Sequence, residues 1–231
     1  MAQVDRAVVL AAGLGTRLKW LTAGQPKAMM DVAGEAAIVR VIRRLAGQGI
    51  ADIAINVHHH AEKLKNYLGD GSRYGTRLYY SHEEQLLDSG GGVRRAMELL
   101  PGSGLIAVHN ADVLADIDLH KLASVASPDG CALAMVNNPA HHPLGDFGLN
   151  NGQVVADKAP GYTYSGVSVW DENIFMAFEI GEVFSLTMPM RLMMDQSELC
   201  GTLHRGYWFD IGRPRDLMMA RKFISAGEKR D

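Results

Sequence analysis

Glycines and cations that could bind phosphate lie close together near the amino terminus. Gly13 and Gly15 follow the apolar residues 7–10, and Arg17 and Lys27 come shortly after them. A glycine loop at the carboxyl end of a strand brings backbone N–H groups close to an anion. Arg17 and Lys27 can neutralise a polyphosphate from two sides. This arrangement predicts a site for a nucleoside triphosphate.

Two common phosphate-binding patterns do not fit this loop. The dinucleotide fingerprint requires a third glycine, where this chain has Leu18, and the P-loop requires Gly-Lys-Ser/Thr, whereas Lys27 follows Pro26. A dinucleotide-dependent oxidoreductase is therefore disfavoured. The simplest alternative to a nucleotide-binding site is a tight turn beside two surface cations.

Two aspartates are candidate metal ligands. Asp112 follows an apolar run in HNADV, and Asp210 lies in YWFDIGRP ahead of a glycine. Either residue alone is typical of a turn or a helix cap. Together they offer two hard oxygen ligands, which suits Mg²⁺ held by a few carboxylates and substrate phosphates.

Other polar residues leave their roles open. The glycine run 90–92 is explained equally well by a flexible loop, and the sequence does not choose between Glu83, Gln85 and Asp88 as contacts to a base or a sugar. Lys158 alone is an ordinary turn lysine. Consecutive histidines cannot all converge on one metal from a strand, and the His141–His142 pair lacks further spaced zinc ligands. The roles of five histidines stay open: His58, His59, His60, His141 and His142.

The expected elements bring the candidate residues to one place. Apolar runs predict strands over residues 6–10, 52–57, 78–80 and 105–109, and helical periodicity predicts helices over 38–45, 61–68 and 90–100. Alternating strands and helices form βαβ units around a mainly parallel sheet, and ligands bind outside the carboxyl ends of its strands. The glycine loop and Asp112 are therefore expected in one crevice.

The second part of the chain is richer in strands. We predict strands over 131–136, 147–149, 153–156 and 162–170, helices over 174–178, 188–194 and 214–226, and a hairpin that pairs 202–205 with 207–210. This predicts an α/β fold with a Rossmann-like, mainly parallel mixed sheet flanked by helices, and a smaller β-rich insertion over the crevice. We expect one domain over 1–231, with a nucleotide-binding part (1–130) and a second part (131–231).

Composition limits the classes of function. The chain has 231 residues, 47% of them hydrophobic, and a formal net charge of −3, which suits one α/β domain and gives no reason to expect nucleic acid as a partner. Cys131 and Cys200 stand alone, as buried free thiols do in a reducing cytoplasm. We see no signal peptide or spanning segment. We therefore expect a cytoplasmic protein without a membrane partner, as a monomer or weak homodimer.

The amino-terminal motif resembles the L-A-A-G-x-G-T-R-L…P-K signature of the sugar-1-phosphate nucleotidyltransferases. Trp20 and Ala28-Met29 depart from the usual pattern beside the phosphate contacts. The resemblance implies the nucleotide-diphospho-sugar transferase fold, Arg17 and Lys27 as catalytic cations, and backbone N–H groups from Ala12 to Thr16 around the triphosphate. The matching nucleotide-binding residues are Leu10, Ala11, Ala12, Gly13, Gly15 and Thr16.

The resemblance extends to the other motifs. HNADV and WFDIGRP are similar to the family's metal-binding elements, with Ala111 and Arg213 as departures, which implies that Asp112 and Asp210 hold Mg²⁺. The glycine stretch implies that Asp88, Gly90 and Gly91 contact the nucleotide, because a Cβ would keep the base from the backbone. Sugar-binding residues implied in the same way are Asp146, Phe147, Gly148 and Lys158.

Four strings, NPAHHPLGDF, YLGDGSRYG, DSGGG and YSGVSVW, are similar to one subgroup, the N-acetylmuramate 1-phosphate uridylyltransferases. This implies transfer of a nucleotidyl group from UTP to N-acetylmuramate 1-phosphate with release of pyrophosphate. Alternatives are a mannose-1-phosphate guanylyltransferase and a non-catalytic regulatory protein that binds nucleotide sugars. Physical reasoning from the residues does not distinguish uridine from guanosine, or one sugar from another.

Overall fold

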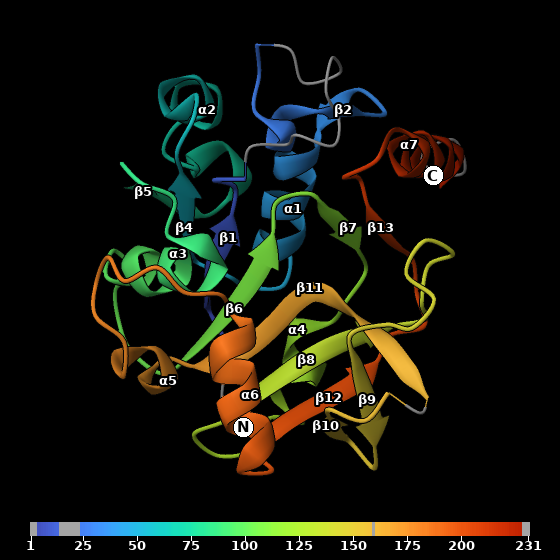
Figure 1. Cartoon of the computed structure of the whole chain (residues 1–231). Coiled ribbons are helices and arrows are strands. Elements are labelled where there is room, and N and C mark those ends of the chain that lie inside the picture. Colours follow the sequence, from blue (N-terminus) through green and yellow to red (C-terminus); the bar gives the residue numbers. More distant parts are fainter. Residues whose placement is uncertain (1–3, 14–23, 159, 228–231) are drawn as a thin grey trace.

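A nine-stranded mixed sheet forms the centre of the computed structural model, which describes residues 4–13, 24–158 and 160–227 (Figure 1). Its strand order is β5-β4-β1-β6-β11-β8-β12-β10-β9. The first four are mutually parallel: β5 (Arg77–His82), β4 (Asp52–Val57), β1 (Arg6–Leu10) and β6 (Leu105–Asn110). The expected parallel half of the sheet is confirmed.

The strands after residue 130 extend the same sheet instead of forming a layer over it. The long β11 (Gly161–Asp171) runs antiparallel to β6 and β8 (Cys131–Val136), and it also pairs with β9 (Phe147–Asn150). Beyond β8 lie β12 (Leu199–Leu203), β10 (Gln153–Val155) and β9. Every residue of β8 is buried, which is typical of a strand with a neighbour on each side and both faces covered.

Helices cover both faces of the sheet. Two hydrophobic clusters result, and adjacent residues of β1 belong to different ones, with Val8 in one and Val9 in the other. The predicted apolar face of α1, with Ile38, Val41 and Ile42, is buried. The helices are α1 (Ala37–Ala46), α2 (Ala61–Leu68), α3 (Asp88–Met97), α4 (Leu119–Ala123), α5 (Asn173–Met176), α6 (Thr187–Asp195) and α7 (Pro214–Gly227).

The predicted hairpin between 202–205 and 207–210 is wrong. β12 begins at the buried Leu199 and pairs in parallel with β8, whereas β13 (Trp208–Asp210) pairs antiparallel with β7 (Val113–Ala115). Between β12 and β13, Gly206 passes the carboxylate of Asp116 so closely that a Cβ would lie 2.1 Å from Oδ1. The chain therefore leaves the main sheet and joins the residues that follow Asp112.

Smaller differences concern helix starts and thiols. The helix predicted over 90–100 begins two residues earlier, at Asp88, and ends at Met97, so the glycine run lies within its first turns. Cys131 and Cys200 are free, but only Cys131 is fully buried. The remaining short elements are β2 (Asp31–Val32), β3 (Glu35–Ala36) and 3-10 turns at Lys27–Met29 and Ser72–Tyr74. Within the described residues, no helix has the length and apolarity needed to span a bilayer.

Candidate active site

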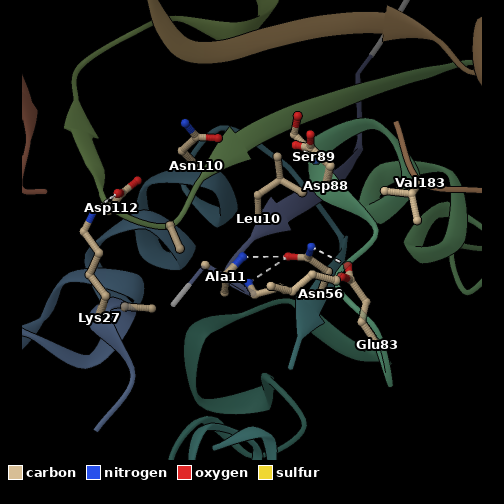
Figure 2. Close-up of a pocket in the computed structure, with 15 residues that line it drawn as sticks. Leu10, Ala11, Lys27, Asn56, Glu83, Asp88, Ser89, Asn110, Asp112 and Val183 are labelled. Atoms are coloured by element: carbon tan, nitrogen blue, oxygen red, sulfur yellow. Dashed lines mark hydrogen bonds and ion pairs between the residues drawn. The ribbon is translucent and has the colours of Figure 1, made fainter. Parts of the chain in front are cut away.

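The carboxyl ends of the central strands open into a cleft of about 470 Å³ (Figure 2). Leu10, the last residue of β1, is paired with Asn56 of β4 on one side and with Asn110 of β6 on the other. All three residues line the cleft. The crevice expected at this edge of the sheet is therefore present.

A buried amide organises the start of the glycine loop. The side-chain oxygen of Asn56 accepts hydrogen bonds from the backbone N–H groups of Ala11 (2.6 Å) and Ala12 (3.3 Å). Its Nδ2 donates to Glu83 Oε1 at 2.8 Å, and Glu83 Oε2 accepts from the N–H of Leu87 at 3.1 Å. The network joins β1, β4 and the residues before α3.

This network changes one expectation about the loop. The N–H of Ala12, predicted to hold the triphosphate, already donates to Asn56, although over the long distance of 3.3 Å. Leu10, Ala11, Ala12 and Gly13 line the cleft. Gly15, Thr16 and Arg17 lie outside the described residues, so their roles remain predictions.

Lys27 and Asp112 form an ion pair at one end of the cleft (Figure 2). The side chains are 11% and 23% exposed. Lys27 is positioned by the 3-10 turn after Pro26, and Asp112 by the turn between β6 and β7. The ammonium therefore lies where a phosphate bound beside Asp112 would meet it.

The second aspartate reaches the same region through the β7–β13 ribbon. Asp210 is paired with Val113, and the N–H of Ile211 donates to the carbonyl of Asp112 at 2.9 Å. Asp210 Oδ1 accepts from the N–H of Gly212 at 2.8 Å. The tertiary pairing thus brings together the backbones of two aspartates that are 98 residues apart, from position 112 to position 210.

The two carboxylates fit a magnesium ion shared with substrate. Among the described residues, nothing hydrogen-bonds Asp112 Oδ1 or Asp210 Oδ2, so each aspartate keeps an oxygen for a cation. No group of three or more His, Cys, Asp or Glu side chains that could hold a metal occurs in the described part of the chain. Mg²⁺ accepts such a site because it keeps waters and binds substrate phosphates.

A second cleft of about 280 Å³ adjoins the first. Asn110 lines both clefts, whereas Asp112 lines the first and Asp210 the second. Gly166 of the YSGVSVW string has φ +84°, and a Cβ there would lie 2.6 Å from Asn110 Nδ2. Glycine therefore allows β11 to pass close to the residue that separates the two clefts.

Asp146 connects the residues of the second cleft. Its Oδ1 lies 2.9 Å from His142 Nε2, and its Oδ2 accepts from the N–H of Tyr164 at 2.9 Å. His141, His142 and Arg213 also line this cleft. The histidines whose roles the sequence leaves open at 141 and 142 are thus placed beside the predicted sugar residue Asp146.

The other predicted sugar-binding residues lie outside that lining. Lys158 Nζ donates to the carbonyl of Gly145 at 2.9 Å, beside Asp146. Phe147 and Gly148 belong to β9, where a Cβ at Gly148 would lie 1.8 Å from the carbonyl oxygen of Asp157. Close backbone packing explains this glycine, and sugar contacts by these three residues remain predictions.

The glycine run of α3 is explained by packing rather than by open space for a base. The N–H groups of Gly90 and Gly91 donate to the carbonyl of Phe184 at 2.9 and 3.1 Å. A Cβ at Gly91 would lie 2.2 Å from the carbonyl oxygen of Glu182. Asp88, which has φ +60°, and Ser89 line the first cleft instead.

Sequence reasoning missed Asn56 and Asn110 and left Glu83 undecided. Both asparagines are polar residues at the ends of apolar strands, at the edge where ligands bind. This signal was available from the strings IAINV and IAVHN. Their roles depend on strand neighbours, which the strings do not reveal.

Comparisons with known proteins agree with this geometry. The model of the family described as nucleotidyl transferase matches residues 6–227. The crystal structure of HddC from Yersinia pseudotuberculosis superposes with a TM-score of 0.79 over 96% of this chain and 100% of that chain, at 22% identity. The fold is therefore that of the nucleotide-diphospho-sugar transferases.

The chain belongs to the nucleotidyl transferase family, as an enzyme of the sugar-1-phosphate nucleotidyltransferase class. It is 37% identical over 229 residues to the N-acetylmuramate alpha-1-phosphate uridylyltransferase of Neisseria meningitidis serogroup B, covering 96% of this chain and 99% of the relative. The protein of the same name from Caulobacter vibrioides is 31% identical, covering 95% and 97%. The family expected from the motifs is confirmed.

Proposed function

We propose that this enzyme transfers UMP from UTP to N-acetylmuramate 1-phosphate, releasing pyrophosphate. The observation that carries the transfer reaction is the junction of two clefts at Asn110, with one aspartate in each. The two relatives named above support the substrate pair. UTP would occupy the first cleft and the sugar phosphate the second.

The reaction needs no general base. The attacking oxygen belongs to a phosphate monoester whose second pKa is about 6, so it is ionised at neutral pH. The enzyme must bring two anions together and stabilise an in-line displacement at the α-phosphorus. Lys27, at the Asp112 end of the first cleft, offsets their repulsion.

Asp112 and Asp210 would hold Mg²⁺ through the oxygens described above. When bound, the ion supplies Lewis-acid stabilisation of phosphoryl oxygens. The contribution of the chain is to place two carboxylates at the junction, because the β7–β13 pairing fixes both backbones. Lys27 balances the charge of Asp112, so that a phosphate meets a cation at this position.

The second cleft suits an acidic sugar. N-acetylmuramate carries a carboxylate on its 3-O-lactyl group, whereas mannose has no such charge. His141, His142 and Arg213 line the cleft, and the guanidinium of Arg213 has no hydrogen bond or ion pair with another described residue. These donors support an anionic group on the sugar and favour the uridylyltransferase over the guanylyltransferase.

The test is the ratio of kcat/KM for UTP with N-acetylmuramate 1-phosphate over GTP with mannose 1-phosphate, followed by pyrophosphate release. We expect a ratio well above about ten, equivalent to more than roughly 1.4 kcal/mol of differential transition-state binding. A ratio below one would assign the enzyme to guanylyl transfer. Binding without pyrophosphate release for every pair would indicate a regulatory protein.

A further inference from the structure

The first cleft has the Lys27–Asp112 ion pair at one end and the exposed side chain of Val183, near Asp88, at the other. Figure 2 shows Lys27 and Asp112 on one side, Asp88 and Val183 on the other, and Leu10 between them. A nucleoside triphosphate is divided in a matching way, with a polyphosphate at one end and, at the other, a flat base that has apolar faces and a polar edge. With the phosphates at Lys27, the base reaches the end formed by Val183.

An exposed apolar side chain, that of Val183, marks that end. Among the described residues lining the cleft, the large hydrophobic side chains that are exposed are Val183, at 61%, and Leu86, at 39%. A ligand that covers apolar surface removes it from water, which stabilises the complex. Binding pockets typically place such side chains against the apolar parts of a ligand.

The backbone around Val183 is held firmly against α3. Phe184 donates its N–H to the carbonyl of Leu87 at 3.2 Å and accepts from Gly90 and Gly91 with its own carbonyl. The N–H of Leu186 donates to Ser89 Oγ at 3.0 Å. The Phe184 ring is buried and stacks on Phe178 with centroids 4.0 Å apart.

The glycines of α3 make this contact possible. A Cβ at Gly90 would lie 2.4 Å from the ring of Phe184, and one at Gly91 would lie 2.2 Å from the carbonyl oxygen of Glu182. At these distances the added Cβ would overlap the neighbouring atoms, so the segment that contains Glu182 and Phe184 would have to move away from α3. The run therefore lets the segment 182–186 approach α3 closely enough to form a wall of the cleft.

We infer that Val183 is a binding residue that packs against the nucleotide base, and that Gly90 and Gly91 act by holding the segment 182–186 in place. This rests on the proposed function only in requiring a nucleoside triphosphate as substrate. It adds a contact from the carboxyl-terminal part of the chain to a site built mainly from residues before 113.

The test compares ligands with and without a base. Dissociation constants of UTP, GTP and inorganic tripolyphosphate are measured by calorimetry for the parent, Val183→Ala and Ile180→Ala. We expect Val183→Ala to weaken the preferred nucleotide by roughly fivefold to tenfold, from lost apolar contact, and tripolyphosphate by less than about twofold. Ile180→Ala is the matched control, because Ile180 is 55% exposed on the same connection but does not line the cleft.

A second variant tests the role of the glycines. Gly91→Ala should displace the segment 182–186 and reproduce the base-dependent loss, again without weakening tripolyphosphate. In steady state, Val183→Ala should raise KM for the nucleotide while kcat changes little, because the base is remote from the reacting phosphorus.

The outcomes separate this inference from the proposed function. If the parent prefers GTP, the uridylyl assignment fails, and the inference is then judged by the loss of GTP binding relative to tripolyphosphate. Equal losses for nucleotide and tripolyphosphate, or no loss for either, would overturn the role of Val183. So would a parent that binds tripolyphosphate as tightly as both nucleotides.

Discussion

At the scale of single residues, the site depends on charges held close together before any ligand binds. Lys27 and Asp112 pair across 85 positions of sequence, and Asp210 keeps one carboxylate oxygen bonded to its own turn. Each charge is thus offset or oriented within the protein. In the reaction proposed above, phosphates and a cation would join this arrangement.

Replacing Lys27 by alanine tests the cation at the reacting phosphate. We expect Lys27→Ala to lower kcat/KM by roughly a hundredfold or more, the scale of losing one electrostatic contact to a charged transition state. Circular dichroism should show a folded protein. Lys65→Ala, on the exposed face of α2, is the control and should match the parent. Turnover near the parent value in folded Lys27→Ala would remove this role.

The aspartates are tested by neutral isosteres. Asp112→Asn and Asp210→Asn should each raise the Mg²⁺ concentration needed for half-maximal rate, because an amide lacks the charge that holds a hard cation. Chelator should abolish parent activity, and Mg²⁺ should restore it. Undiminished activity in chelator contradicts a metal in the mechanism. An effect confined to one variant leaves the other aspartate as a turn residue.

Lys158 probes the sugar side. Its ammonium is bonded to the carbonyl of Gly145, next to Asp146, so it lies near the second cleft without lining it. We expect Lys158→Ala to raise KM for the sugar phosphate more than KM for the nucleotide, measured with the other substrate saturating. Equal changes in the two KM values, or none, would leave Lys158 as a surface lysine.

At the scale of elements, the site depends on strand ends that are adjacent at one edge of the sheet. The carboxyl ends of β1, β4 and β6 are adjacent, so residues 10, 56 and 110 lie side by side. Asn56 ties the residues that follow β1 to β4 and to the residues before α3 by bonding Ala11 and Glu83 at once. The position of the glycine loop is therefore a property of three strands.

Removing the Asn56 amide should loosen that junction. Asn56→Ala leaves the partly buried N–H of Ala11 and a buried carboxylate oxygen of Glu83 without this partner, and each unmade bond costs about 1–3 kcal/mol. We expect a loss of about 2–4 kcal/mol in the free energy of unfolding by urea, together with lower activity. Asn66→Ala, at an exposed position of α2, is the control. A loss below about 0.5 kcal/mol would show that the network is not stabilising.

At the scale of the whole molecule, the site exists because one sheet carries two halves of different topology. The parallel half supplies the glycine loop and Asn56, and the antiparallel β11 supplies Gly166 beside Asn110. The β7–β13 ribbon then adds Asp210. Segments outside the main sheet also contribute, since Val183, between α5 and α6, lines the first cleft and Val113 of β7 lines the second.

Global stability should depend on pH through His109, on β6. Burial lowers the pKa of His109 to about 4 from its ordinary value of 6.5, against opposing effects of its bond to Asn110 and of Asp112. Between these values the unfolded chain binds a proton that the folded chain does not. Stability is therefore complete above pH 6.5 and falls as the pH decreases through this window.

We expect His109 to account for a loss of about 2 kcal/mol in unfolding free energy between pH 7 and pH 5. Urea titrations of His109→Asn should show a decrease smaller by that amount, whereas His120→Asn, an exposed control, should follow the parent. Asp52 does not affect this comparison. Its hydrogen bond with Arg77 lowers its pKa from the ordinary value of 3.8, so its effect on the unfolding free energy falls below the pH range in which His109 acts. Equal pH dependence in parent and His109→Asn would contradict the prediction.

The sequence alone predicted features encoded over short spans. The apolar runs at 6–10, 52–57, 105–109 and 131–136 are strands, and the periodicity of 38–45 is a helix. The class of enzyme followed from the resemblance of the glycine-cation motif and the two aspartate motifs to those of a known family. Such features can be predicted because side chains that must be buried recur every 2 residues in a strand and every 3.6 residues in a helix.

The tertiary structure decided which of these elements meet. It replaced the expected 202–210 hairpin by β12 on β8 and β13 on β7, and it gave Gly90 and Gly91 a packing role against the segment 182–186. It also set Asn56 and Asn110 on either side of Leu10. Strand partners lie far apart in the chain, and a local pattern shows that a strand needs a neighbour without identifying it, so only the folded molecule determines how the two clefts are built.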